Sequence, residues 1–228
     1  MNWLSQTLTS SLGKKLIMAL TGLFLILFLT GHLLGNLQLL KDDGGQAFNE
    51  YAKFMTTTPV IKILSYLTYI CIILHVIYSL ILTIHNRKAR PIKYAVSHQS
   101  ENSVWTSRNM GILGTIVLLF LVIHLRSFWY EMHYGSIPTI EYEGGGQIKN
   151  LYQIVVEAFS QLWYVILYVV SMAALAFHLS HGFQSAFQTL GLRHQKYTPI
   201  IKSAGLLFAI LVPALFALQP VYIYLKNL

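Results

Sequence analysis

The chain has 228 residues, of which 55% are hydrophobic and 11% are charged, and its net charge is +8. Soluble domains usually carry about 25% charged residues, so this composition indicates a membrane protein and disfavours a soluble enzyme, a disordered chain or a nucleic-acid-binding protein. The single cysteine, Cys71, excludes an internal disulfide, a four-thiolate iron–sulfur cluster and covalent haem attachment through a C-x-x-C-H motif. The glycine run at 144–146 does not lie between a strand and a helix, so we expect no nucleotide site there.

Five segments without charged residues predict transmembrane helices, because about 20 apolar residues cross a bilayer. The third charge-free segment, 109–125, has only 17 residues, and the interfacial aromatic residues that follow it extend the span. The prediction is an all-α integral membrane protein whose single domain covers residues 1–228. The five predicted helices cover about 14–40, 60–86, 109–131, 152–189 and 200–225.

The charged residues outside these spans are divided unequally between the two sides of the membrane. With the N-terminus inside, the inner segments carry ten basic residues and one acid, Glu101, whereas the outer segments carry six basic residues and seven acids. Cytoplasmic segments retain Lys and Arg during insertion, so we expect a cytoplasmic N-terminus and an outside C-terminus. Two interpretations of the basic inner loops stay open: an insertion signal alone, or a docking surface for a soluble partner. The inner basic residues are Lys14, Lys15, Arg87, Lys88, Arg90, Lys93, Arg108, Arg193, Lys196 and Lys202.

Four of the nine histidines lie inside apolar spans, one in each of the first four: His32, His75, His124 and His178. A polar ring within a bilayer must find a partner or remain a costly unsatisfied group. The remaining histidines apart from His181 fall at span ends or in loops, where we expect them to be solvated or interfacial. They are His85, His98, His133 and His194.

The positions of the four buried histidines along their spans predict two pairs. His32 and His124 lie about 17 and 16 residues from the inner ends of their spans, whereas His75 and His178 lie about 12 and 15 residues from theirs. In an up-and-down bundle, helices one and three, and helices two and four, stand diagonally across the core, so each pair can face a common centre. Two imidazoles without carboxylates or thiolates suit bis-histidine haem iron, whereas zinc needs a third or fourth ligand. The first four helices are therefore predicted to form a haem-binding bundle.

Small residues near these histidines are expected to leave space for a porphyrin. The alternative for Gly31-x-x-x-Gly35 is simple close packing of two helices. His181 is the alternative to His178 as the ligand on the fourth helix, because it lies three residues away on nearly the same helix face. Gly182 favours His178, because its lack of a side chain is expected to leave space on the helix face beside that ring. The small residues are Gly31, Gly35, Ser79, Gly111, Gly114 and Gly182.

These motifs resemble one family, the cytochrome b subunit of succinate dehydrogenases and fumarate reductases in its five-helix, two-haem form. The stretches at 11–22 and 31–36 look like the Bacteroidetes-type version, and His178-x-x-x-Gly182 is similar to the fourth-helix ligand motif of the family. The resemblance covers nearly the whole chain. It implies two haem b groups, an outer one held by His32 and His124 and an inner one held by His75 and His178 as axial iron ligands.

The resemblance also implies partners and a location. The chain would be a membrane anchor in the bacterial cytoplasmic membrane, in contact with lipid, for a flavoprotein subunit with FAD and an iron–sulfur subunit on the cytoplasmic side. Electrons would pass from succinate through the partners' FAD and iron–sulfur clusters to the inner haem, the outer haem and menaquinone. The chain alone is not expected to oxidise succinate. A dimer of the whole complex is compatible with this assignment, and no nucleic-acid partner is expected.

Other positions leave alternatives open. Ala176 stands where some di-haem fumarate reductases carry a transmembrane glutamate, so a proton route through that position is doubtful. Glu50 loosely resembles a family acid near the quinone site, and a solvated surface acid is the alternative. Arg126 and Lys41 are candidates for pairing with haem propionates or for anchoring at the interface.

Two other functions also stay open. One is a cytochrome b of a hydrogenase or a formate dehydrogenase. The other is a transporter that uses membrane histidines, which is disfavoured because only the boundary residue Glu157 could serve as an intramembrane acid in a proton relay.

Overall fold

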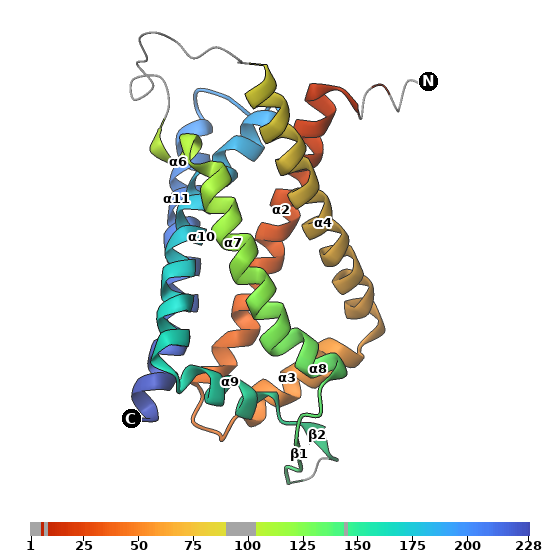
Figure 1. The fold of residues 1–228 in the computed structure, drawn as a ribbon, viewed down its shortest axis with the longest axis vertical. Helices are drawn as coiled ribbons and strands as arrows, with labels where there is room; N and C mark the ends of the chain where they lie inside the picture. The colour runs from red at the N-terminus through yellow and green to blue at the C-terminus, as the bar shows by residue number, and fades with distance from the viewer. Residues whose placement is uncertain (1–5, 7–8, 90–103, 144–145) are drawn as a thin grey trace.

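Five long apolar helical segments run up and down along the long axis of the molecule (Figure 1). The structure, a computed structural model, describes residue 6 and residues 9–89, 104–143 and 146–228. Each of the five segments is long and apolar enough to cross a bilayer, so the chain is a multi-pass helical membrane protein. The segments are Ser11–Leu40, Pro59–Lys88, Met110–Tyr134, Leu162–Thr189 and Thr198–Lys226.

The first two spans begin at clear N-terminal signals. The side chain of Ser10 accepts a hydrogen bond from the backbone N–H of Gly13 at 3.0 Å and so caps the first helix. Pro59 opens the second span at a position where its missing N–H costs nothing. The elements of this half are α2 (Ser11–Asn36), the 3-10 helix η1 (Leu37–Leu40), α3 (Gln46–Thr57) and α4 (Pro59–Lys88).

The third span changes its helical type near the outer end predicted from the sequence. The α-helical part ends at His124, and the next six residues form a π-helix, which the sequence analysis did not predict. A short antiparallel pair of strands follows, with Thr139 opposite Lys149. The elements are α6 (Trp105–Arg108), α7 (Met110–His124), η2 (Leu125–Tyr130), α8 (Glu131–Tyr134), β1 (Thr139–Ile140) and β2 (Ile148–Lys149).

The prediction of one continuous fourth helix over 152–189 is wrong. The segment is divided into α9 (Leu151–Phe159) and α10 (Leu162–Thr189), with an extended backbone at Gln161 between them. The predicted helix is longer than a bilayer requires, and its first part forms α9, which contains Glu157 and lies beside α3 at one end of the bundle (Figure 1). The last span is α11 (Thr198–Lys226).

The helices that carry the four buried histidines form a ring with one open edge. Helix α2 packs against α4 and α10, and α10 packs against α7 and α11. Within the described residues, α4 and α7 make at most slight contact with each other. Few of their residues are buried, namely Thr68 and Cys71 in α4 and Leu113 in α7. Helix α11 also packs against α2, so the fifth span is part of the bundle.

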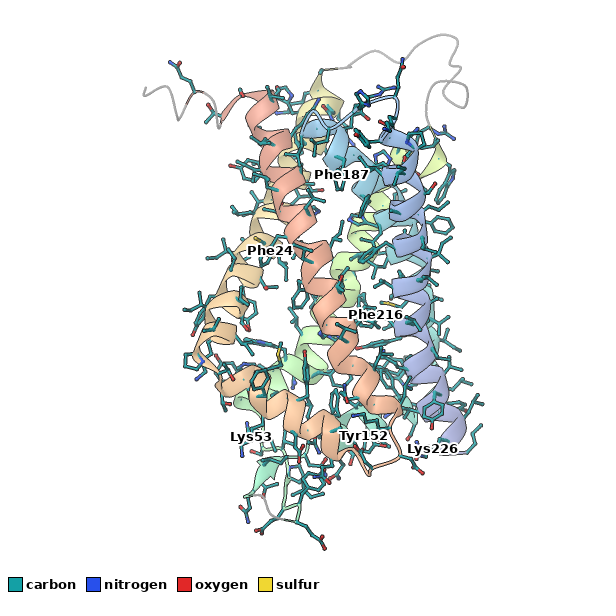
Figure 2. All side chains as sticks on the ribbon, turned by 180° about the vertical axis from the view of Figure 1, so that it is seen from behind. Phe24, Lys53, Tyr152, Phe187, Phe216 and Lys226 are labelled. Carbon is teal, nitrogen blue, oxygen red and sulfur yellow. The ribbon has the colours of Figure 1, made fainter. Side chains whose placement is uncertain are left out.

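The outer surfaces of the helices suit lipid. Apolar side chains project outward along the whole length of the bundle (Figure 2), and Leu27, Leu119 and Leu207 are 72%, 61% and 58% exposed. Exposed apolar area of this extent indicates contact with a membrane or a partner rather than water.

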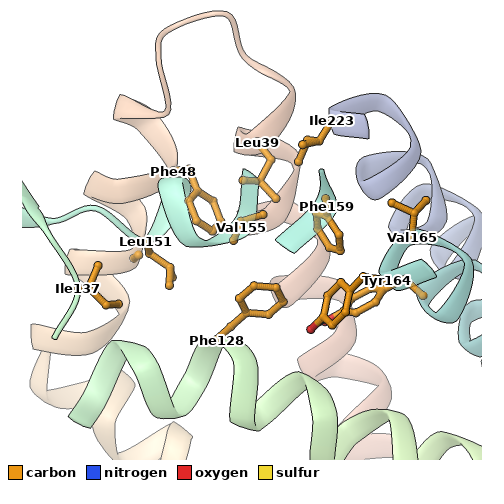
Figure 3. Packing of buried hydrophobic residues seen from close by; sticks show 12 residues of the cluster. Leu39, Phe48, Phe128, Ile137, Leu151, Val155, Phe159, Tyr164, Val165 and Ile223 are labelled. Carbon is orange, nitrogen blue, oxygen red and sulfur yellow. The ribbon is translucent and has the colours of Figure 1, made fainter. Parts of the chain in front are cut away.

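A densely packed apolar cluster closes the end of the bundle where the C-terminus lies (Figure 3). We call it the terminal core. It joins the π-helix, α3, α9, α10 and α11, so it fixes the ends of four spans relative to one another. Its members include Leu39, Phe48, Phe128, Ile137, Leu151, Val155, Phe159, Tyr164, Val165 and Ile223. At the same end, Lys226 donates a hydrogen bond to Asp42 at 2.8 Å, and that bond and the Lys226 charge lower the pKa of the Asp42 carboxyl.

One buried amide connects the parts of this end. Asn49 is only 1% exposed, and its Nδ2 donates to Tyr142 Oη at 3.0 Å and to Asn150 Oδ1 at 2.9 Å. Its Oδ1 accepts from the backbone N–H of Tyr152 at 2.9 Å. The side chain thus ties α3 to the segment between the strands and to the start of α9.

We predict that Asn49→Leu lowers the free energy of unfolding by about 2–4 kcal/mol, because it removes three hydrogen bonds of a buried amide and leaves the Tyr152 N–H without the acceptor it has in the structure. Denaturant titration in detergent micelles, followed by tryptophan fluorescence, measures the change. Gln153→Leu, on the exposed face of α9, is the control and should change stability by less than about 0.5 kcal/mol. Equal stability of the two variants would contradict the structural role of Asn49.

Candidate functional site

The four histidines inside the spans are partly buried and lie in two facing pairs at two levels of the bundle. The rings of His32 on α2 and His124 on α7 have centroids 5.8 Å apart and are nearly perpendicular. The rings of His75 on α4 and His178 on α10 have centroids 6.3 Å apart. These are the two pairs that the span positions predict.

The spacing and the donor set of each pair fit a haem iron. A metal-bound imidazole nitrogen lies about 2 Å from the metal and the ring centroid about 1 Å further, so rings on opposite sides of one metal have centroids about 6 Å apart. Within the described residues, no group of three or more His, Cys, Asp or Glu side chains comes together. Two imidazoles alone suit a metal whose other ligands come from a porphyrin, rather than zinc.

One ring nitrogen also lacks a partner. His178 Nδ1 is buried and has no hydrogen bond. Burying a polar nitrogen without a partner costs free energy, and such a group fits a residue whose partner is a bound group. This observation adds to the fit of the His75–His178 pair as a cofactor site.

Aromatic side chains enclose the His32–His124 pair. Phe28 stacks on His32 with centroids 5.3 Å apart, and Phe216 of α11 lies 5.6 Å from the same ring. Phe120 and Phe128 flank His124 at 5.7 and 5.6 Å. Phe128 belongs to the π-helix that begins directly after His124, and π-helical turns inside α-helices are frequent at functional sites. These rings give the pair a mainly apolar surrounding.

Two hydroxyl groups contact the paired histidines, and the sequence analysis missed both. Thr21 Oγ1 lies 3.2 Å from His75 Nδ1, and Tyr168 Oη lies 3.0 Å from His124 Nδ1. Thr21 precedes His32 by eleven residues, or about three helical turns, so helical periodicity places both on one face of α2. No comparable sequence signal marks Tyr168.

The glycines near the histidines differ in what surrounds them, and a Cβ at Gly31 or Gly111 would meet nothing within 4 Å. A Cβ at Gly22 would lie 3.3 Å from His75 Cε1, a tight contact, so the absence of a side chain at Gly22 admits this ring. A Cβ at Gly114 would lie 3.7 Å from His178 Cε1, which is an ordinary van der Waals contact. Gly35 instead receives the ring of Tyr51 from α3, and burial raises the pKa of the Tyr51 hydroxyl. Neither interpretation of Gly35 from the sequence, close packing of two helices or space for a porphyrin, predicted this contact with Tyr51.

The role predicted for Gly182 is wrong. A Cβ there would meet Met110 and would not come within 4 Å of the His178 ring. What distinguishes His178 from His181 is instead the position of His75, whose ring faces His178.

The other candidate residues lie away from the paired rings. Glu50 is exposed on α3, accepts a hydrogen bond from Gln46 at 2.8 Å and lines an open cleft with Tyr142 and Ile148.

Arg126 pairs with Glu131 and lies over the ring of Tyr130 at 4.6 Å, which favours the interpretation as an interface anchor. Lys41 is exposed. Arg90, Lys93, His98 and Glu101 lie outside the described residues.

Comparison of the chain with family models, with curated proteins and with solved structures found no match. The functional argument therefore rests on the residues and their geometry.

We predict that Gly22→Leu displaces the His75 ring and removes the cofactor expected at the His75–His178 pair, because the added side chain needs the space that the ring occupies. Haem b per purified chain, measured as the pyridine haemochrome, should fall from two to about one. Gly146→Leu is the control, since a Cβ at Gly146 meets nothing within 4 Å and Gly146 lies outside the five spans. Equal haem content in the two variants would contradict the assigned role of Gly22.

Proposed function

We propose that this chain is the membrane-anchor, di-haem cytochrome b subunit of a succinate:quinone oxidoreductase, that is, of a succinate dehydrogenase or fumarate reductase. In that complex it would pass electrons between an iron–sulfur subunit and menaquinone. The observation that carries the proposal is that four intramembrane histidines on four helices form two facing pairs with centroids 5.8 and 6.3 Å apart. The resemblance of the motifs at 11–22, 31–36 and 178–182 supports the choice of family.

In this proposal each pair of histidines has one task. His32 and His124 would hold the outer haem, and His75 and His178 would hold the inner haem. Haem supplies reversible one-electron chemistry, while the protein sets its ligands, burial and hydrogen bonds. The two levels lie along the bundle axis: Thr21, at the level of His75, and His32 are eleven residues apart on α2, about 16 Å of helix.

The two ends of the bundle support different partners. The start of α2 and the ends of α4 and α10 lie at one end of the molecule (Figure 1). The start of α2 carries Lys14 and Lys15, the end of α4 carries Arg87 and Lys88, and Arg193 follows α10. This basic end is the proposed docking surface for the iron–sulfur and flavoprotein subunits. At the opposite end, the cleft with Glu50 and Tyr142 combines polar and apolar walls, which suits the headgroup and the tail of a quinone.

The first prediction from this proposal is two haem b groups per chain. His32→Ala or His124→Ala should remove mainly the outer haem, and His75→Ala or His178→Ala mainly the inner one, because each pair then loses one axial ligand. Haem stoichiometry and the reduced-minus-oxidised spectrum measure the losses. His181→Ala is the control and should keep both haems. One haem or none in fully loaded wild-type chain, or loss of a haem only in His181→Ala, would contradict the pairing.

The second prediction concerns the place where electrons leave. In the complete complex, His124→Ala should leave reduction of the inner haem by succinate intact and abolish reduction of menaquinone, because the quinone cleft lies at the end of the bundle nearer His32 and His124. Stopped-flow spectra and quinone reduction assays report the two steps separately. Full quinone reduction by this variant would move the quinone site beside the inner haem.

Identification of the proteins that purify with the chain separates the leading proposal from its relatives. A flavoprotein that oxidises succinate and an iron–sulfur protein are expected. If a hydrogenase or formate dehydrogenase subunit purified with the chain instead, the chain would be assigned to another class of membrane cytochrome b.

A further inference from the structure

Each histidine pair contains one ring that a hydroxyl group contacts at Nδ1. In the inner pair this ring is His75, which lies 3.2 Å from Thr21 Oγ1, and in the outer pair it is His124, which lies 3.0 Å from Tyr168 Oη. An imidazole binds a metal through one nitrogen only, so the group at its other nitrogen determines which nitrogen is free.

The direction of the Thr21 hydrogen bond follows from its other contacts. Thr21 Oγ1 lies 2.8 Å from the backbone oxygen of Ile17 and 3.2 Å from that of Met18, both of which can only accept. The single hydroxyl hydrogen therefore points to a carbonyl group, and the lone pairs of Oγ1 face His75. His75 Nδ1 must then be the donor, which leaves its Nε2 without a hydrogen and free to bind a metal.

Tyr168 occupies the equivalent place beside His124. Its side chain is 6% exposed, and the rings of Phe120 and Phe159 each pack against it with centroids 4.9 Å away. Its hydroxyl group lies 3.5 Å from that of Tyr164, which can accept its hydrogen. Tyr168 Oη can then accept from His124 Nδ1, again leaving Nε2 free.

The second ring of each pair lacks such an anchor. His178 Nδ1 is buried without a hydrogen bond. The amide of Asn36 makes its short bond, at 2.7 Å, to the backbone oxygen of His32 and lies 3.4 and 3.5 Å from the two ring nitrogens. The structure thus gives one ring in each pair a hydroxyl partner at Nδ1 and gives the other ring none.

We propose that Thr21 and Tyr168 are positioning residues that hold His75 and His124 with Nδ1 protonated and Nε2 free to bind haem iron. The inference rests on the proposed function and adds two residues to it. An acceptor at Nδ1–H fixes the ring and increases the basicity of the ligating nitrogen, which stabilises the oxidised iron. Each hydroxyl should therefore affect one haem and not the other.

The test compares Thr21→Val and Tyr168→Phe in the chain loaded with haem. Thr21→Val should weaken retention of the inner haem about 10- to 100-fold and leave the outer haem unchanged, whereas Tyr168→Phe should do the reverse. For the affected haem, the ratio of reduced to oxidised haem at a fixed potential should rise about threefold to tenfold. This change corresponds to an increase of about 28–59 mV in the one-electron reduction potential. Spectroelectrochemical titration and haem release on dilution measure both effects.

Three further variants separate positioning from general damage. Thr21→Ser keeps the hydroxyl and should restore the wild-type potential and retention. Thr115→Val removes a hydroxyl that bonds only to its own helix, and Tyr69→Phe removes one that contacts Trp129. Both should leave the two haems unchanged. Electron paramagnetic resonance of the oxidised chain adds a readout of ring orientation that a merely structural role would not alter selectively.

The outcomes distinguish this inference from the proposed function. A wild-type chain that binds no haem contradicts the proposed function and this inference together. A wild-type chain with two haems, combined with a Thr21→Val or Tyr168→Phe variant that behaves like its control, overturns the inference alone. Equal effects of Thr21→Val and Thr21→Ser would also overturn it, because the hydroxyl group would then not be the cause.

Discussion

The rest of the structure depends on one constraint: an imidazole inside a bilayer must have a polar partner. Four helices each place one such ring in the interior, and in each pair the two rings face each other with centroids about 6 Å apart. Direct packing of two helices normally leaves their axes about 8–10 Å apart, with interdigitated side chains between them. The open edge between α4 and α7, and the few residues buried on those two helices, are consistent with the proposed binding of groups inside the bundle.

A bundle with an open edge needs stabilisation elsewhere. The terminal core provides it, because side chains from the π-helix, α3, α9, α10 and α11 meet there in one cluster. Asn49 adds directional bonds within the same end and fixes α3 against α9. Phe128 links this core to the outer pair, since it contacts both Phe159 and His124. The position of His124 therefore depends on packing outside the membrane span as well as within it.

Much of this arrangement follows from the sequence because charge marks the ends of the spans and a helix rises by a constant amount per residue. Those two facts place the five spans and predict that His32 meets His124 and that His75 meets His178. Charge counting cannot find the division at Gln161, because it detects the absence of charge and not the direction of the backbone. The π-helix and the Tyr168 contact depend on how α7 and α10 rotate against each other. That rotation is set by tertiary packing, which leaves no periodic signal.

The two central helices, α2 and α10, each contribute one residue to each of the two histidine pairs. Helix α2 carries His32 for the outer pair and Thr21 for the inner pair, whereas α10 carries His178 for the inner pair and Tyr168 for the outer pair. These two helices pack against each other, and α4 and α7 lie on their flanks. Each flanking helix contributes one ring, and the hydroxyl that contacts that ring comes from a central helix. A shift between α2 and α10 would therefore alter ligand and hydroxyl positions at both levels, so the contact between α2 and α10 couples the two pairs.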